Sequence, residues 1–406
     1  GDTWGRARML QSALVVYIIG ALACTLANDV TVLAIGRLVQ GLGGGGLMSL
    51  SQALISDVVT PRHRGRAQGN ISAISVLAST LGPLMGGVMV ESLGWRSLFL
   101  STVPLALVAM VVLRRWKLPV QVVTTQRRFD TGGFLTMLAL VFGITAALEL
   151  AGNPETQLAA MIGGFAAIVG LAGLIWTQKR AANPMFPPDL FAIPAISRAA
   201  FAVFCHGAAL VSLVTTIPLF HAILRTDGAI ATAISMVALT VAFGIAGFIT
   251  GNLLTLTGRT VLFPALTLPL SVGLLIFLSV VGPDLGQGAL MATYLAIGLS
   301  LGTVMSVMFT IIQVEAPSAA RGRAAGAVTF FRSIGAVVGT ALTAFVLFAV
   351  APAGSDAGAI LSGALHANPA ELAEWRLAFQ ATFLTIAAII VVEWLLVVLN
   401  PARRID

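Results

Sequence analysis

The hexapeptide Arg64-Gly65-Arg66-Ala67-Gln68-Gly69 returns as Arg321-Gly322-Arg323-Ala324-Ala325-Gly326, 257 residues further along the chain. Gly82 corresponds to Gly339 at the same offset of 257 residues. Parallel repeats of this kind occur in membrane proteins built from two halves that are related by an axis along the membrane normal. The repeat therefore predicts two pseudo-symmetric helix bundles.

The composition places these bundles in a lipid bilayer. Of the 406 residues, 58% are hydrophobic and 10% are charged, whereas a soluble domain carries about 25% charged residues. A bilayer core of about 30 Å needs about 20 apolar residues per spanning helix. Mainly apolar windows of this length, without the polar alternation of barrel strands, predict an all-α integral membrane protein with twelve transmembrane helices. The windows cover residues 9–27, 31–56, 67–90, 97–113, 131–148, 156–178, 199–224, 228–258, 260–283, 285–314, 324–350 and 377–400.

The positive charge of the loops predicts the orientation. Of the 23 Lys and Arg residues, 18 fall in loops on one side of the windows. Arg96, Arg225 and Arg376 fall on the other side, while Arg37 and Arg332 lie inside windows. Because cytoplasmic loops are enriched in Lys and Arg, we expect a multi-pass protein of the plasma (inner) membrane with both ends of this chain cytoplasmic. The net charge of +7 is spread over separate loops, which excludes a nucleic-acid-binding stripe.

A second repeat indicates where the halves lie. Gly5-Arg6 returns as Gly258-Arg259, and eight predicted helices separate the two pairs. If each half has six helices, two helices are inserted between the halves and two are missing before Gly1, where the chain starts without Met. We therefore expect an incomplete four-helix N-terminal bundle, an inserted helix pair with flanking cytoplasmic linkers, and a C-terminal six-helix bundle. These segments cover residues 1–115, 116–195 and 196–406.

Three motifs carry a resemblance to a known family. Residues 1–8 (GDTWGRAR) resemble the end of the signature loop between the second and third helices of major facilitator superfamily transporters. Residues 33–41 (LAIGRLVQG) resemble the signature of the fourth helix, and residues 82–87 (GPLMGG) the fifth-helix signature associated with antiporters. With the inserted helix pair and the long outer loop at 351–376, the chain resembles the fourteen-helix drug:proton antiporter branch of that superfamily.

The resemblance implies a secondary active transporter that exports drugs or other small molecules against protons by alternating access. Its expected partners are a small-molecule substrate, protons and the lipid bilayer, with a periplasmic adaptor protein as a further candidate. The alternatives are an inactive fragment of a transporter and an exporter of a metabolite that is not a drug. A channel or membrane enzyme is disfavoured because the chain lacks a filter-like polar loop, a nucleotide-binding loop and a catalytic dyad. Residues 41–46 match G-x-G-x-x-G only inside a membrane helix, so no dinucleotide cofactor is expected.

Arg37 is the candidate proton-coupling residue. It lies inside an apolar window, where an arginine costs at least about 2.5–3.5 kcal/mol on the insertion scale. The guanidinium either snorkels to the outer interface, about 9 Å away, or faces a partner or cavity in the protein. The resemblance implies the second role, opposite an acidic residue on a helix that precedes this chain.

The resemblance also implies a cytoplasmic gate, which would latch the halves through the contact of Arg6 with Asp57 and through Asp2. Topology determination alone is the alternative explanation for these charges. The gate residues are Asp2, Gly5, Arg6 and Asp57. A helix-packing motif consists of Gln40, Gly41, Gly82, Pro83, Gly86 and Gly87. Glycines four residues apart allow close backbone approach, which serves either static packing or a sliding contact during transport.

Polar and aromatic residues on the helices that line the cavity of this superfamily form the candidate substrate cavity. They are Gln52, Asn70, His206, Thr216, Tyr294, Phe331 and Arg332. Hydrogen bonds between helices explain polar residues in membranes equally well. The candidate partners of Arg332 are an anionic or polar substrate, a carbonyl at a helix break, and Glu393. Glu393 itself is interpreted as a packing or lipid-interface residue. Four His and two Cys without a ligand cluster predict no metal site.

The topology gives a first prediction. Cysteines introduced at Ser355 and at Ala319, in a variant without native cysteines, should be labelled by membrane-impermeant thiol reagents only from the periplasmic and the cytoplasmic side, respectively. The reason is the excess of Lys and Arg on the side that carries Ala319. Labelling of both positions from one side would contradict the twelve-helix topology.

Overall fold

The computed structural model describes residues 6–58, 74, 78, 81–82, 85–115, 130–150, 156–182, 184–186, 188–225, 228–317, 321–352 and 369–404. Within these ranges eleven helices are long and apolar enough to cross a membrane. The predicted all-helical membrane fold is confirmed. The window at 67–90, which the sequence predicts as a further span, lies largely outside the described residues.

The chain forms two compact units, residues 1–128 and 129–406. The helices of the first unit include α1 (Arg6–Thr25), α2 (Val30–Val58) and α4 (Arg96–Arg115). α1 packs against both α2 and α4. The contact between α1 and α2 depends on glycine, because a Cβ atom on Gly36 would lie 2.9 Å from the backbone nitrogen of Cys24. Small residues let helix backbones approach closely where lipid provides no hydrophobic drive for association.

The glycines of the predicted packing motif have other surroundings within this unit. A Cβ atom on Gly41 or Gly82 would meet no described atom within 4 Å, and one on Gly86 would meet only the Leu98 side chain, at 3.5 Å. The close backbone contacts between α1 and α2 lie at Gly36 and Gly43 of α2 and at Gly20 of α1, which meets the backbone of Gln40. Gln40 is buried and Gly87 is half-buried. A role of the motif in transport stays a prediction.

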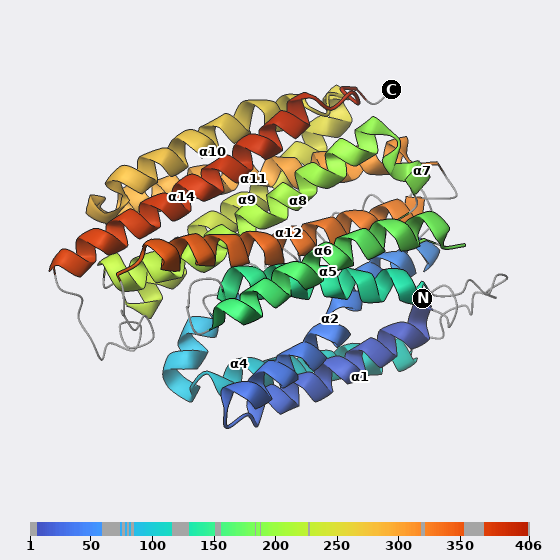
Figure 1. Ribbon diagram of the computed structural model, residues 1–406, viewed down its shortest axis with the longest axis horizontal. Coiled ribbons are helices and arrows are strands. Elements are labelled where there is room, and N and C mark those ends of the chain that lie inside the picture. Colours follow the sequence, from blue (N-terminus) through green and yellow to red (C-terminus); the bar gives the residue numbers. More distant parts are fainter. Residues whose placement is uncertain are drawn as a thin grey trace. The chain divides into compact units, whose positions relative to one another are not determined.

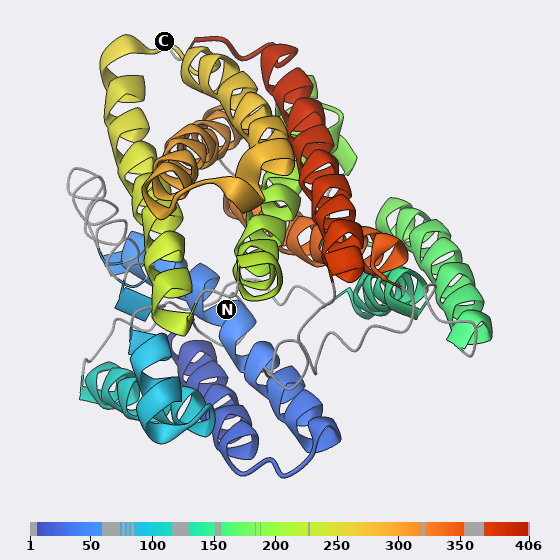
Figure 2. The ribbon, with the colours of Figure 1, turned by 90° about the vertical axis from the view of Figure 1, so that its left-hand side faces the viewer.

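The second unit holds the remaining helices (Figure 1). They are α5 (Thr131–Leu150), α6 (Gln157–Arg180), α7 (Pro188–Phe191), α8 (Pro194–Phe220), η3 (His221–Arg225), α9 (Ala229–Thr257), α10 (Leu262–Val281), η4 (Gly282–Asp284), α11 (Gln287–Glu315), α12 (Arg321–Val350) and α14 (Pro369–Val398). α8 packs against α11, α12 and α14 and forms much of the buried core. α9 pairs with α11, and α10 with α14, as Figure 2 also shows.

The predicted inserted helix pair corresponds to α5 and α6. These two helices pack against each other, and α5 also contacts α12. In the structure the pair therefore belongs to the second unit. The described part of the pair includes a polar link, in which the Gln178 amide donates to the Asp130 carboxylate at 2.7 Å. Its origin as an insertion between two six-helix halves stays a prediction.

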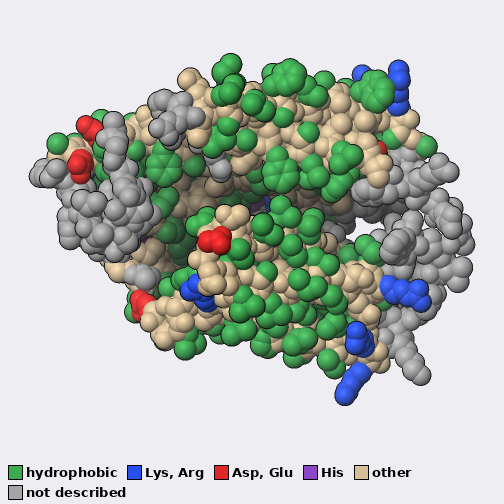
Figure 3. Space-filling view, turned by 60° about the horizontal axis from the view of Figure 1, so that its bottom comes forward, with side chains coloured by type: hydrophobic (Ala, Val, Ile, Leu, Met, Phe, Trp, Pro, Cys, Tyr) green, Lys and Arg blue, Asp and Glu red, His purple; other side chains and the backbone are tan. Residues whose placement is uncertain are grey.

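Apolar side chains cover most of the helix surface. Figure 3 shows them spread over the visible face, with few charged side chains among them. Many leucines and isoleucines of the spans are exposed, for example Leu105 at 73% and Leu266 at 69%. A soluble protein rarely exposes so large an apolar surface. The surface is suited to contact with lipid chains.

The helices α8 and α12 approach each other backbone to backbone. A Cβ atom on Gly335 would overlap the backbone carbonyl of Phe204, and one on Gly207 would overlap that of Arg332. Gly339, the repeat partner of Gly82, meets the backbone of Ala208 in the same way. This contact fixes the position of Arg332 relative to α8.

The α8–α12 contact gives a second prediction. Gly335→Ala should lower the free energy of unfolding by about 1–3 kcal/mol, because overpacking forces the two backbones apart. Gly326→Ala on the same helix is the matched control. A Cβ there meets no described atom within 4 Å, so the change should be neutral or slightly stabilising. Unfolding of both variants in detergent would be measured against the unchanged protein, and equal effects would contradict the close approach.

Candidate functional site

A buried pair of ionisable side chains joins two helices of the second unit. The His206 Nδ1 atom on α8 lies 2.9 Å from the Glu393 Oε1 atom on α14. The side chains are 1% and 0% exposed. An acid and a base so deeply buried must satisfy each other, because each alone would cost several kcal/mol to desolvate. The pair is therefore a strong tie between α8 and α14.

The surrounding helices position this pair. The Asn400 amide, just after α14, donates to the Ala195 carbonyl at the start of α8 at 3.1 Å. The end of α14 thus lies beside the beginning of α8, and the two helices run antiparallel. The His206 ring also stacks on Phe243 of α9, with ring centroids 5.8 Å apart. These contacts set the orientation of the imidazole.

Two polar atoms of the pair have no partner. Within the described residues, His206 Nε2 and Glu393 Oε2 are buried and make no hydrogen bond. With one shared proton the pair is electrically neutral, and a second proton gives it a net charge of +1 inside the protein. Each partner therefore keeps one open hydrogen-bonding position inside the protein.

The structure decides between the two sequence interpretations of Glu393, because full burial agrees with a packing residue and excludes a lipid-interface residue. Glu393 is neither a lipid-interface residue nor a partner of Arg332, because it is fully buried against His206. The Arg332 Nε atom is buried without a hydrogen-bond partner in the described part of the chain. A signal for the role of Glu393 was present in the sequence, since an acid inside an apolar span is rare and needs a partner. Its spacing to His206 could not be read from the sequence, because 187 residues separate the two.

Three other candidate cavity residues, Tyr294, Thr216 and Phe331, have different neighbours from this pair. Tyr294 is buried on α11, and its hydroxyl lies 3.2 Å from His221 Nε2. Thr216 is buried on α8, ten residues beyond His206, which is about 15 Å along a helix. Phe331 belongs to an aromatic cluster instead. The rings of this cluster are those of Phe186, Phe191, Phe201, Phe330 and Phe331.

Arg37 of the first unit has neighbours that are polar or aromatic but not acidic among the described residues. Its guanidinium carbon lies 4.4 Å from the centroid of the Phe99 ring on α4. Its Nη1 atom donates to Gln40 Oε1 at 3.4 Å. A cation over an aromatic ring is stabilised by about 0.5–2 kcal/mol, which lowers the cost of the charge inside a span. Proton coupling through Arg37 stays a prediction.

Several candidate residues fall outside what the structure describes. Asp2, Gly5, Asn70 and Pro83 lie outside the described residues, as do the side chains of Arg6, Gln52 and Asp57. The predicted cytoplasmic gate therefore stays a prediction. Among the described residues, no group of three or more His, Cys, Asp and Glu side chains could hold a metal ion.

Comparison with known protein families identifies the family of this chain. The sequence profile described as Major Facilitator Superfamily matches residues 1–340. The chain belongs to this superfamily. It is therefore part of a multi-pass membrane protein of a transporter superfamily.

Relatives and solved structures agree with the assignment to the Major Facilitator Superfamily. An uncharacterized MFS-type transporter of Mycobacterium tuberculosis is 32% identical over 346 residues, which are 84% of this chain and 50% of that protein. The multidrug transporter protein MdtP of Bacillus subtilis is 28% identical over 350 residues, 85% of this chain and 64% of that protein. This chain thus spans half of the first relative's length. A bacterial homologue of the human lysosomal transporter Spinster shares the fold, with TM-score 0.61 and 14% identity over 98% of this chain and 83% of that one.

The buried pair gives a third prediction. Removing one partner, in His206→Leu or Glu393→Leu, should lower the free energy of unfolding by about 3–5 kcal/mol, because an unpaired ionisable group is left in the core. The double variant should lose much less than the sum of the two losses.

The matched control for this cycle is the exposed ion pair of Arg376 with Asp284, whose closest atoms are 2.8 Å apart. Its coupling energy should be about 0.2–1 kcal/mol, since water screens exposed charges. Unfolding in detergent measures both cycles. Similar coupling energies in the two pairs would contradict a strong interaction between His206 and Glu393.

Proposed function

We propose that the full protein exports drugs or other small molecules across the plasma (inner) membrane in exchange for protons, by alternating access, as a fourteen-helix member of its superfamily. The motifs at residues 1–8, 33–41 and 82–87 support this proposal. So do the names of its relatives, which include a multidrug transporter and the multidrug resistance protein 3 of Bacillus subtilis. A periplasmic adaptor protein as a further partner stays a prediction.

The observation that carries the proposal is the buried His206–Glu393 pair. Proton exchange needs a group that gains and loses a proton inside the membrane, and intramembrane ionisable residues are functional sites by default. The pair supplies an acid and a base at hydrogen-bond distance, with one open position on each. Among the ion pairs described in the second unit, this one joins an acidic and a basic side chain that are both buried.

The helices around the pair offer little to compensate the charge of a second proton. α9 and α10 carry no ionisable side chain at all. Nearby on α8 is Cys205, and α12 contributes Arg332. A second proton would thus leave a net positive charge with no acidic neighbour on α8, α9, α10 or α12, which is costly in a low dielectric. The protonated pair would be stabilised by separating α14 from α8, which admits water or substrate.

This link between charge and helix position is the coupling step in the proposal. Release of the proton restores a neutral pair and draws α14 back onto α8. Each state of the pair would thus favour a different arrangement of the helices. A bound proton can shift a conformational equilibrium only if it interacts differently with the two states, and the broken or formed hydrogen bond provides that difference.

The fourth prediction tests the proposal. Glu393→Gln keeps the size and hydrogen bonding of the side chain but cannot carry a proton at this site. In the full-length protein, reconstituted in liposomes with an imposed pH gradient, it should reduce drug export by roughly 100-fold or more, a typical contribution of a positioned proton-transfer group. Exchange of labelled for unlabelled drug without a gradient should survive, because that exchange needs no net proton movement.

Asp284→Asn is the matched control, since it removes a carboxylate from the exposed pair with Arg376. It should leave both activities unchanged. The drug would be one to which the full-length protein confers resistance in cells. Proton-driven export that persists in Glu393→Gln would contradict a coupling role of this pair.

The same assay examines Arg37. If it takes part in proton coupling, Arg37→Ala should abolish proton-driven export while membrane insertion is retained, and Arg37→Lys should restore part of it because the charge is kept. Unchanged drug-dependent proton flux in Arg37→Ala would favour the snorkelling role. The result separates coupling in the first unit from coupling in the second.

A further inference from the structure

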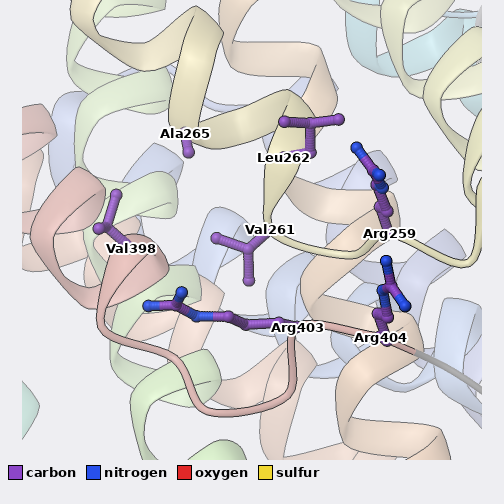
Figure 4. A pocket seen from close by; sticks show the side chains of 7 residues that line it. All are labelled: Arg259, Val261, Leu262, Ala265, Val398, Arg403 and Arg404. Carbon is purple, nitrogen blue, oxygen red and sulfur yellow. The ribbon is translucent and has the colours of Figure 1, made fainter.

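A cleft of about 490 Å³ lies at the end of the second unit where α10 begins and α14 ends (Figure 4). Its lining combines three arginines with four apolar residues. These are Arg259, Val261, Leu262, Ala265, Val398, Arg403 and Arg404. In Figure 4 the Arg259 side chain lies above that of Arg404, and the Arg403 side chain extends below Val261 toward Val398.

Backbone hydrogen bonds hold the three arginines together. The Thr260 amide donates to the Arg403 carbonyl at 3.2 Å, and the Thr260 hydroxyl donates to the Ala402 carbonyl. Arg259 and Arg404 form an isolated antiparallel bridge. Gly258, with φ of 64°, ends α9 in the left-handed conformation that starts this turn. The cluster is therefore built by the chain itself and needs no acidic side chain to assemble it.

No described residue compensates the charge of this cluster. Arg259, Arg403 and Arg404 are exposed, and their side chains form no ion pair or hydrogen bond with any described residue. Three like charges around one cleft repel each other and favour an anion.

The arginines of the opposite, predicted outer, side differ. Arg96 donates to the Ala27 carbonyl at 2.7 Å, Arg225 to the Leu285 carbonyl at 2.6 Å, and Arg376 pairs with Asp284. Each of those three cations has a partner within the protein. Among the described residues the three-arginine cluster has no such partner, which favours an external anion.

An apolar track leads from the cluster into the span. Leu262, Leu266 and Leu270 follow one another at intervals of four residues along α10 and are 37%, 69% and 53% exposed. Residues four apart lie on one face of a helix. On the neighbouring α14, Leu395 is 44% exposed, and Leu399 just beyond its end is 60% exposed. A soluble anion would make no favourable contact with these leucines, whereas the acyl chain of a lipid would pack against them.

We propose that this cleft binds an anionic phospholipid, with the headgroup phosphate between Arg259, Arg403 and Arg404 and an acyl chain along the leucines of α10. Basic pockets between helices on the cytoplasmic side bind such headgroups. The proposal rests on the predicted orientation, which places the cluster in the cytoplasmic leaflet, and is independent of proton coupling. The bound lipid joins the turn after α9 to the segment that follows α14.

The test compares two lipids and a free anion. Detergent-purified full-length protein would be titrated with phosphatidylglycerol or phosphatidylcholine of equal chain length, and bound lipid would be counted by native mass spectrometry. Phosphatidylglycerol should bind more tightly. Arg259→Gln, Arg403→Gln and Arg404→Gln should each weaken it about fivefold, the effect of one basic residue near an anionic surface, and the triple variant by roughly 100-fold.

Two controls make the result decisive. Arg114→Gln with Arg115→Gln removes two exposed arginines at the end of α4, and phosphatidylglycerol binding should not change. Inorganic phosphate at millimolar concentration should not displace the lipid, since it lacks the apolar chain. The proposal is overturned if the triple variant binds phosphatidylglycerol as before, if the α4 variant loses as much, or if phosphate displaces the lipid. Loss of transport in Glu393→Gln would leave this outcome untouched.

Discussion

A charge inside a hydrocarbon layer has to be neutralised within the protein, and this constraint is strongest at the His206–Glu393 pair. Both side chains are almost completely buried, and each is the other's partner. Because neither can be left alone without a large desolvation cost, α8 and α14 are tied at this point. α14 in turn packs on α10 and α12. The arrangement of the second unit thus depends on one short contact between an acid and a base.

The glycine contacts of α8 extend this dependence to α12. Gly207 follows His206 directly, and its backbone lies against the carbonyl of Arg332. Neighbouring residues of one helix turn therefore meet α14 on one side and α12 on another. Lipid provides no hydrophobic drive between helices, so such close backbone contacts supply much of the packing energy. A shift of α8 relative to α14 would also change the surroundings of Arg332 on α12, whose buried Nε atom has no described hydrogen-bond partner.

The arginines at the two ends of the second unit differ in whether they have partners among the described residues. At the predicted outer end, Arg225 donates to backbone carbonyls and Arg376 pairs with Asp284. At the other end, Arg198 donates to the carbonyl of Leu399, but the arginines of the three-residue cluster face the surroundings. Cationic side chains are attracted to anionic lipid when no described residue pairs with them, and this attraction is also the physical reason why Lys and Arg indicate the orientation of a membrane protein.

The sequence by itself determined the fold class, because about 20 apolar residues can cross a bilayer only as a helix. It also singled out Arg37, Arg332 and His206, since polar groups in apolar spans are conspicuous. It left Glu393 open between packing and the lipid interface, and it spread the candidate cavity over residues with different neighbours, such as Tyr294 and Phe331. Pairing across 187 residues depends on helix rotation and crossing, which backbone contacts at Gly207 and Gly335 decide. A one-dimensional pattern carries no such information, so only the tertiary structure could join His206 to Glu393 and Arg259 to Arg404.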